Sequence, residues 1–221
     1  MDINCQRFKI AVVIVFLVFP LLVFGQKMPE NYVIYSKYLK LNQDNKKDKL
    51  NYVIRVSNDD REGGREDIMD MTQDFGHYLK GDKSALNGFF GGRRALVPVL
   101  IADTLWLPLL ERLYKNMGKQ YLIQNKFSNG LQITMLTYNH YDEYFDKSNA
   151  RDIEDGWASF REDYPERPFL IGLSEVVNDG QRAVFYFSSK CGSLCGVGQL
   201  VLFYKEKSEW KFVLAISLWN A

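Results

Sequence analysis

The C-terminal third of the chain alternates apolar and polar residues over four runs that short turns separate. The runs LIGLSEVV (170–177) and QRAVFYFSS (181–189) flank Asn-Asp-Gly at 178–180, a combination typical of a β-hairpin turn. The alternation continues in QLVLFYKE (199–206) and WKFVLAISLW (210–219). Four consecutive strands with short connections predict an antiparallel β-meander, whose apolar face needs helices to cover it. Strict alternation divides the last strand into one side with Trp210, Phe212, Leu214, Ile216 and Leu218, and another with Lys211, Val213, Ala215, Ser217 and Trp219.

Upstream of the meander, apolar residues recur every three or four positions, which predicts helices. The predicted helices cover 66–79, 108–117 with Pro108 as the first residue, and about 150–164. Gly81 and Gly118 are placed to end the first two helices, and Pro165 is placed to end the third. Ser148 or Asn149 is the expected N-cap of the third helix.

The other upstream segments are shorter or ambiguous. The tyrosine-rich stretch after residue 29 fits a helix about as well as a strand, whereas 50–56 and 131–137 are typical of strands. The apolar run 95–110 predicts a buried strand or a turn that enters a helix. The fold class is therefore α+β, with an N-terminal mixed helical region packed on a C-terminal antiparallel β-meander.

The first 25 residues have the pattern of a secretory signal peptide. Arg7 and Lys9 precede the apolar run Ile10–Phe24, and Gly25 follows it. The run is shorter than the roughly 20 residues that a membrane-spanning helix needs, and Pro20 interrupts it. Residues 1–25 are thus predicted to be removed on export, and 26–221 to form a single α+β domain that is secreted or periplasmic. The alternative is an uncleaved anchor, and this segment is then the expected contact with a membrane.

The charge balance argues against a nucleic-acid partner. The chain has 28 basic and 27 acidic residues, a formal net charge of +1, whereas nucleic-acid-binding domains are clearly basic. The short basic cluster at 46–49 contains Asp48 and is typical of a solvated loop. An EF-hand loop that begins at Asn58 would need glutamate at its twelfth position, where Met69 stands. No cofactor or metal is therefore predicted.

The cysteines favour a disulfide. Cys5 leaves with the signal peptide, and Cys191 and Cys195 remain in a compartment that tolerates disulfides. Residues four apart in a strand lie about 13 Å from each other, whereas a disulfide needs Cα atoms about 4.4–6.8 Å apart. The chain must therefore curl between the two cysteines. The turn glycines Gly192, Gly196 and Gly198 would permit this, because glycine adopts positive φ at little energetic cost.

The familiar catalytic patterns are incomplete. A papain-type nucleophile would need a downstream histidine, but both His77 and His140 precede the cysteines. A thioredoxin-like centre has two residues between its cysteines, and this chain has three. A structural zinc site would have to combine the two cysteines with two remote histidines. No G-x-S-x-G motif occurs.

One pattern in the last third of the chain resembles that of a family of secreted bacterial proteins to which no activity is assigned. The matching residues are Trp157 and Phe160, Tyr164-Pro165, Leu173-Ser174, Ala183-Val184, Cys191 to Gly198, and Trp210-Lys211 through Trp219. The chain departs from the family pattern after Pro165, where it has Glu166-Arg167-Pro168 instead of small residues and a glycine. The resemblance implies export and a β-rich C-terminal end, and it implies no catalytic residue.

Together these features predict a secreted or periplasmic, non-catalytic binding or envelope-associated protein whose partner is a protein or a cell-envelope ligand. An exposed aromatic patch with Trp219 or the tyrosines near 138–144 is the expected place for that partner. The alternative is a secreted hydrolase in which His140 converges with acids only in the fold. The carboxylates available for it are Asp142, Glu143, Asp146, Asp152, Glu154 and Asp155.

Overall fold

The computed structural model describes residues 28–44, 51–55, 57–58, 64–89, 91–117, 119, 121–128, 130–145, 152–166 and 169–221. The predicted signal peptide lies outside the described residues. So do the predicted helix cap at Ser148 or Asn149, the predicted terminator Gly118, the carboxylate Asp146 and most of the acidic loop considered for calcium.

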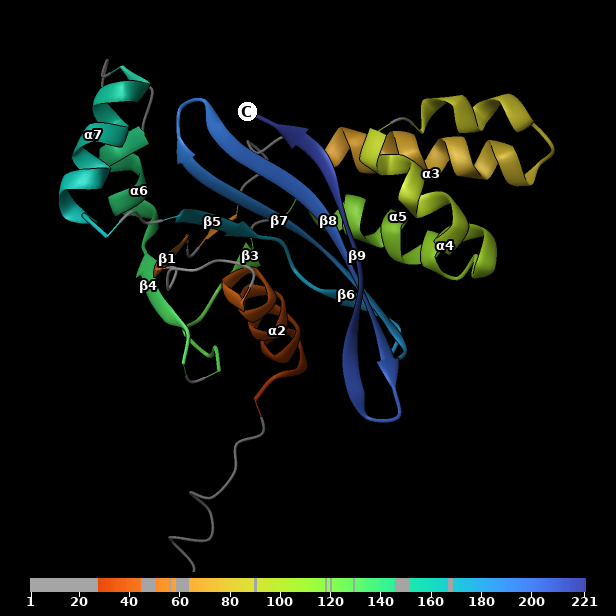
Figure 1. The fold of residues 1–221 in the computed structure, drawn as a ribbon, viewed down its shortest axis with the longest axis horizontal. Helices are drawn as coiled ribbons and strands as arrows, with labels where there is room; N and C mark the ends of the chain where they lie inside the picture. Colours follow the sequence, from red (N-terminus) through yellow and green to blue (C-terminus); the bar gives the residue numbers. More distant parts are fainter. Residues whose placement is uncertain are drawn as a thin grey trace, which may run out of the picture.

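A seven-stranded mixed sheet forms the centre of the molecule (Figure 1). Its strands are β1 (Asn51–Arg55), β4 (Gln132–Leu136), β5 (Phe169–Leu173), β6 (Val177–Asn178), β7 (Arg182–Gly192), β8 (Cys195–Glu206) and β9 (Glu209–Asn220). The order is β4-β1-β5-β7-β8-β9, with β6 paired to β7. Strands β5, β7, β8 and β9 are antiparallel neighbours, which confirms the meander. Strand β1 pairs in parallel with both β4 and β5, so the N-terminal half extends the same sheet. A separate small ladder joins β2 (Ser57–Asn58) to β3 (Tyr121–Leu122).

Helices cover both faces of this sheet. One face, here named the α2 face, packs against α2 (Glu30–Asp44). The opposite face, named the α3 face, packs against α3 (Arg65–Leu79), α4 (Leu96–Ala102) and α5 (Trp106–Met117). Helices α6 (Tyr138–Phe145) and α7 (Ile153–Asp163) form a third cluster on β1, β4 and β5. Figure 1 shows α6 and α7 at one end of the sheet and α3 to α5 at the other.

The α2 face has an aromatic core. Tyr32, Tyr35, Tyr38 and Leu39 recur at helical spacing along α2 and are buried. Tyr38 meets Phe185, Phe187 and Phe212 with ring-centroid distances of 5.7, 5.1 and 6.1 Å. The ambiguous tyrosine-rich stretch is therefore a helix, because these residues need one continuous stripe to cover neighbouring strands.

The helix predictions hold with shifted boundaries. Helix α3 is confirmed, and Gly81 follows it with φ 103°. Helix α5 begins at Trp106, so Pro108 is its third residue rather than its first. The run 95–110 contains helix α4, a turn and the start of α5, so the alternative of a turn that enters a helix is confirmed and the strand is wrong. The predicted cap of the third helix is wrong: α7 begins at Ile153, and Asp152, rather than Ser148 or Asn149, caps it by accepting a hydrogen bond from the Glu154 amide. Helix α6 was not predicted.

The predicted sidedness of the final strand is wrong. Two β-bulges interrupt β9, at Val213 and Leu218. Each bulge inserts one extra residue opposite β8, which shifts the alternation by one position. Trp210 therefore packs on the α2 face, whereas Leu214 and Ile216 pack on the α3 face.

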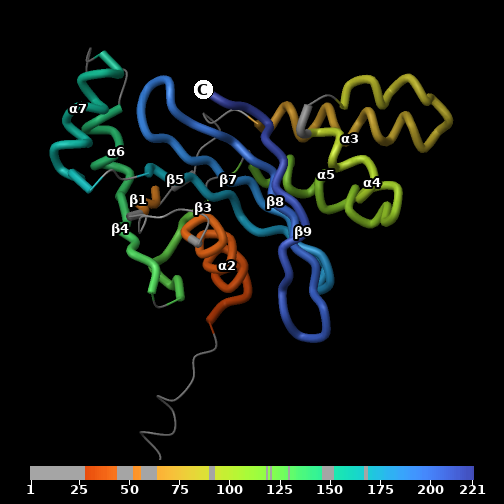
Figure 2. Tube along the Cα trace, in the orientation of Figure 1, coloured from red at the N-terminus to blue at the C-terminus, as the bar shows by residue number. Residues whose placement is uncertain are grey.

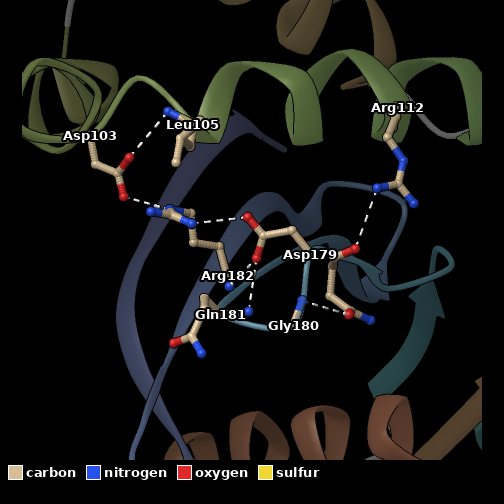
Figure 3. A network of polar contacts seen from close by, with 8 residues as sticks. Asp103, Leu105, Arg112, Asp179, Gly180, Gln181 and Arg182 are labelled. Atoms are coloured by element: carbon tan, nitrogen blue, oxygen red, sulfur yellow. Dashed lines mark hydrogen bonds and ion pairs between the residues drawn. The ribbon is translucent and has the colours of Figure 1, made fainter.

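Arg182 is the centre of a polar network that joins the β6–β7 hairpin to the α4–α5 connection (Figure 3). Its Nε donates to Oδ2 of Asp103 at 2.5 Å, and its Nη1 donates to Oδ2 of Asp179 at 2.9 Å. Asp179 Oδ1 also accepts hydrogen bonds from two backbone amides of the turn, at 2.8 and 2.7 Å. Arg112 on α5 donates to the Asn178 carbonyl oxygen at 3.3 Å. The network fixes the helices of the α3 face to the meander.

The carboxylate of Asp179 should make the stability of the fold depend on pH. Burial raises the pKa of this carboxyl group. The backbone amides of Arg182 and Gln181 and the Arg182 guanidinium together lower it by more, so the net pKa lies below its ordinary value. Ionised Asp179 therefore stabilises the fold above about pH 4, and the contribution is lost as pH falls through the lowered value.

We expect Asp179→Asn to lower the free energy of unfolding by about 0.5–1 kcal/mol at pH 7. The substitution removes the negative charge but keeps a side-chain oxygen that can accept hydrogen bonds from the backbone amides of the turn. Urea titrations at pH 7 and pH 2.5 measure the difference between the two chains. The difference should vanish at pH 2.5, and a difference that persists there would contradict the electrostatic account.

Candidate functional site

The cysteine turn closes the β7–β8 hairpin. A disulfide joins Cys191 and Cys195, with 5.2 Å between their Cα atoms, and Gly192 pairs directly with Cys195. Ser193 and Leu194 form the two-residue turn, and Leu194 is 87% exposed. Figure 2 shows this turn at the same end of the sheet as the C-terminal residue.

The turn glycines have a different role from the predicted one. Among the described glycines, positive φ occurs at four positions, and 192, 196 and 198 are not among them. A Cβ on Gly198 would instead lie 2.0 Å from Nε1 of Trp219 and 2.6 Å from the Tyr186 hydroxyl oxygen. A Cβ on Gly196 would lie 3.1 Å from Cζ3 of the same indole. These two glycines therefore let Trp219 lie across β8, where its Nε1 donates to the Tyr186 hydroxyl at 2.8 Å.

On the α2 face, the same end of the sheet carries a cavity of about 440 Å³, here named the hollow. Its lining residues are Asn42, Tyr52, Phe169, Phe187, Ser189, Cys191, Cys195, Gly196, Val197, Gln199, Asn220 and Ala221. They come from α2, β1, β5, β7, β8 and the end of the chain, so strand pairing and the disulfide hold most of the wall in place. The volume lies within the range of small-molecule sites, about 300–1,000 Å³.

The hollow exists because helix α2 is too short to cover the strands below it. The helix follows β8 from Glu30, whose Oε1 lies 2.5 Å from Nζ of Lys205, to Tyr38, which reaches Gln199. Fifteen helical residues span about 22 Å, whereas the twelve residues of β8 span about 40 Å. The strands therefore continue beyond the last turn of α2, and their exposed surface forms the floor of the hollow.

Three aromatic rings provide the apolar surface of the hollow. Tyr52 and Phe169 are register partners on β1 and β5, and Phe187 lies on β7. Tyr52 and Phe187 are 3% and 4% exposed, and the Tyr52 hydroxyl donates to the Leu39 carbonyl oxygen at 3.0 Å. The rings are fixed by packing before any ligand arrives.

The polar groups of the hollow are amides and a hydroxyl. The Tyr38 hydroxyl donates to Oε1 of Gln199 at 2.7 Å, and burial raises the pKa of Tyr38 to about 12, so the phenol stays protonated. This contact orients the Gln199 amide, whose Nε2 has no hydrogen-bond partner within the part of the chain that the structure describes. Asn42 Nδ2 donates to the Tyr38 carbonyl at 3.2 Å, which leaves its Oδ1 as an acceptor. Ser189 adds a hydroxyl group.

The described lining contains no charged side chain. Aromatic faces with amide and hydroxyl groups suit a neutral ligand that has an apolar face and hydrogen-bonding edges. The same described lining contains no His, Asp, Glu or Lys side chain, and its two cysteines are joined in the disulfide.

The residues considered for hydrolysis do not converge. His77 and His140 are both exposed, on α3 and α6, at opposite ends of the sheet (Figure 1). Among the carboxylates, Asp152 caps α7 and Glu154 accepts a hydrogen bond from Ser193. Within the described ranges no three His, Cys, Asp or Glu side chains gather as a metal site. These placements count against the hydrolase hypothesis.

The aromatic patch expected around Trp219 and the tyrosines near 138–144 is mostly engaged inside the protein. Trp219 packs over Gly196 and Gly198. Tyr141 lies under Arg55, with 4.6 Å from Cζ to the ring centroid, and Tyr144 donates to Asp163. Tyr138 is the exposed member, at 42%. The hollow was missed because its rings come from three strands that are remote in sequence.

No helix within the described residues combines the length and apolar character needed to cross a bilayer. Comparison of the chain with protein-family models, with curated proteins and with solved structures finds no match.

Alanine substitutions at Gly198 and Gly192 should affect stability to different extents. Gly198→Ala should lower the free energy of unfolding by about 1–3 kcal/mol, because its Cβ would displace the Trp219 indole. Gly192→Ala is the matched control, since its nearest neighbour would be Cys195 Cβ at 3.7 Å, and it should change stability by less than about 0.5 kcal/mol. Urea unfolding followed by tryptophan fluorescence measures both. Equal effects would show that the glycines serve the turn and not the indole.

Proposed function

We propose that this protein is a secreted or periplasmic, non-catalytic binding protein and that the hollow beside the disulfide is its ligand site. The observation that carries the proposal is the preformed cavity, in which buried aromatic rings and an oriented, donor-bearing amide face the same space and no described lining side chain is charged. A rigid site of this kind binds with little loss of conformational freedom.

The ligand class follows from the lining. A pyranose sugar has an apolar face of C–H groups that can lie on an aromatic ring, and an edge of hydroxyl groups that pair with amides. Phe169, the most exposed of the three rings, would contact the apolar face, above the nearly buried rings of Phe187 and Tyr52. The hydroxyl edge would pair with Gln199, Asn42 and Ser189. We therefore propose a neutral carbohydrate, which fits the cell-envelope ligand expected from the sequence.

Export is supported by two independent features. The first is the N-terminal segment with its basic residues and apolar run, and the second is the Cys191–Cys195 disulfide, a bond that oxidising compartments maintain. The resemblance of the C-terminal pattern to secreted bacterial proteins agrees with both.

A sugar panel tests the ligand class. Glucose, galactose, N-acetylglucosamine and their β-1,4-linked dimers would be titrated into the mature chain and followed by isothermal titration calorimetry. We expect at least one to bind, and Gln199→Met to weaken it about 2- to 10-fold, as loss of one or two neutral hydrogen bonds would do. The matched control, Gln181→Met, removes an exposed amide at the far end of the meander and should leave affinity unchanged. The proposal fails if no sugar binds at 10 mM or if both variants behave alike.

Intact mass spectrometry tests export and the disulfide together. The full chain, expressed with its own N-terminus in a bacterial host, should appear outside the cytoplasm. Its mass should match a chain that begins near Gln26 and has two hydrogens fewer than the form with two free thiols. Reduction should restore the two hydrogens. A chain that retains residues 1–25, or that carries two free thiols when isolated without reductant, would contradict these two parts of the proposal.

A further inference from the structure

A second cavity, of about 360 Å³, lies between helices α3 and α5 and is here named the α3–α5 groove. It is lined by Met69, Thr72, Gln73, Gly76, His77, Lys80, Glu111, Tyr114 and Lys115. The buried stripe of α3, at Ile68, Met71 and Phe75, faces the sheet, so the groove follows the flank of that helix. Both helices pack on the opposite face of the sheet from α2, and Figure 1 shows them at one end of the sheet.

Gly76 is the unusual residue of this groove. It sits in the interior of α3, where glycine destabilises a helix relative to alanine, and a Cβ built on it would have no neighbour within 4 Å. Packing therefore does not require glycine at this position. Gly156 in α7 is the contrasting case, since its Cβ would lie 2.2 Å from the Tyr144 carbonyl oxygen. Because Gly76 has no side chain, the floor of the groove is open at this position.

The groove also holds unpaired positive charge. The ammonium groups of Lys80 and Lys115 have no ion pair or hydrogen bond within the described residues. Glu111 contributes one negative charge, so the two lysines leave the groove net positive. Met69 and the Tyr114 ring supply apolar surface beside these charges.

We propose that the α3–α5 groove binds a small amphiphilic anion, with its apolar body over Gly76 and its carboxylate held by the Lys80 and Lys115 ammonium groups. Charge complementarity selects an anion, and the apolar wall selects a ligand with an aliphatic or aromatic body rather than a bare inorganic ion. This site differs in chemistry from the hollow and does not depend on the function proposed for it.

Octanoate and 1-octanol form the probe pair, because they share a chain length and differ in charge. Calorimetric titration of the mature chain should show octanoate binding roughly 5-fold more tightly than 1-octanol, the factor expected for partly exposed ion pairs. The double variant Lys80→Gln/Lys115→Gln should abolish this preference. The control Lys83→Gln/Lys126→Gln, which removes two exposed lysines outside the groove, should retain it.

Substitutions at Gly76 test the role of the open groove floor. Gly76→Leu should weaken both probes at least 10-fold by filling the floor, while Gly76→Ala should raise the thermal midpoint by about 1–4 °C and weaken binding less. Gly156→Ala should lower the midpoint. The proposal is overturned if Gly76→Leu leaves octanoate affinity unchanged, if 1-octanol binds as tightly as octanoate, or if Gly76→Ala lowers the midpoint as Gly156→Ala does.

Discussion

Burial of strands β7 and β8 on both faces is the constraint on which the rest of the structure depends. Consecutive residues 183–187 and 200–203 are each at most 4% exposed, so over these residues neither side of the two strands faces water. An antiparallel sheet usually leaves one face solvated, and burying the second face requires a second helical layer. The chain supplies α2 for one face and α3 to α5 for the other, and the Arg182 network and the Glu30–Lys205 pair fasten these layers to the hairpins at their edges.

Covering long strands with short helices leaves parts of the sheet open, and those openings are where binding becomes possible. The three longest meander strands have eleven or twelve residues and span about 36–40 Å, whereas a fifteen-residue helix spans about 22 Å. On the α2 face the uncovered end becomes the hollow. On the α3 face Trp219 covers the corresponding end of β8, and this explains why glycine stands at 196 and 198. One tryptophan therefore closes one face, while the other face stays open beside the same disulfide.

Local patterns in the sequence predicted the elements, whereas long-range packing decided their details. The hairpin signal at 178–180 and the spacing of Ile68, Met71 and Phe75 depend on neighbours within a few residues, and both were interpreted correctly. The bulges at Val213 and Leu218, the contact of Gly198 with Trp219 and the parallel insertion of β1 depend on partners far along the chain. The disulfide was predicted from two cysteines and a compartment, but the hollow beside it was not, because Tyr52 lies more than 100 residues before the other two rings in the sequence.

The two proposed sites should differ in how much side-chain conformational entropy is lost when a ligand binds. The hollow is walled by paired strands, buried rings and a disulfide, so few rotamers remain to be lost when a ligand enters. The α3–α5 groove is walled in part by Lys80, Lys115 and Met69, whose long side chains lose conformational entropy when they are ordered. A ligand of the groove must offset that loss with both ion pairs and apolar contacts. A neutral ligand lacks the ion pairs, and a purely ionic ligand lacks the apolar contacts. The proposed preference of the groove for amphiphilic anions would follow from its long side chains, whereas the proposed ligand of the hollow would be selected by the shape of fixed walls.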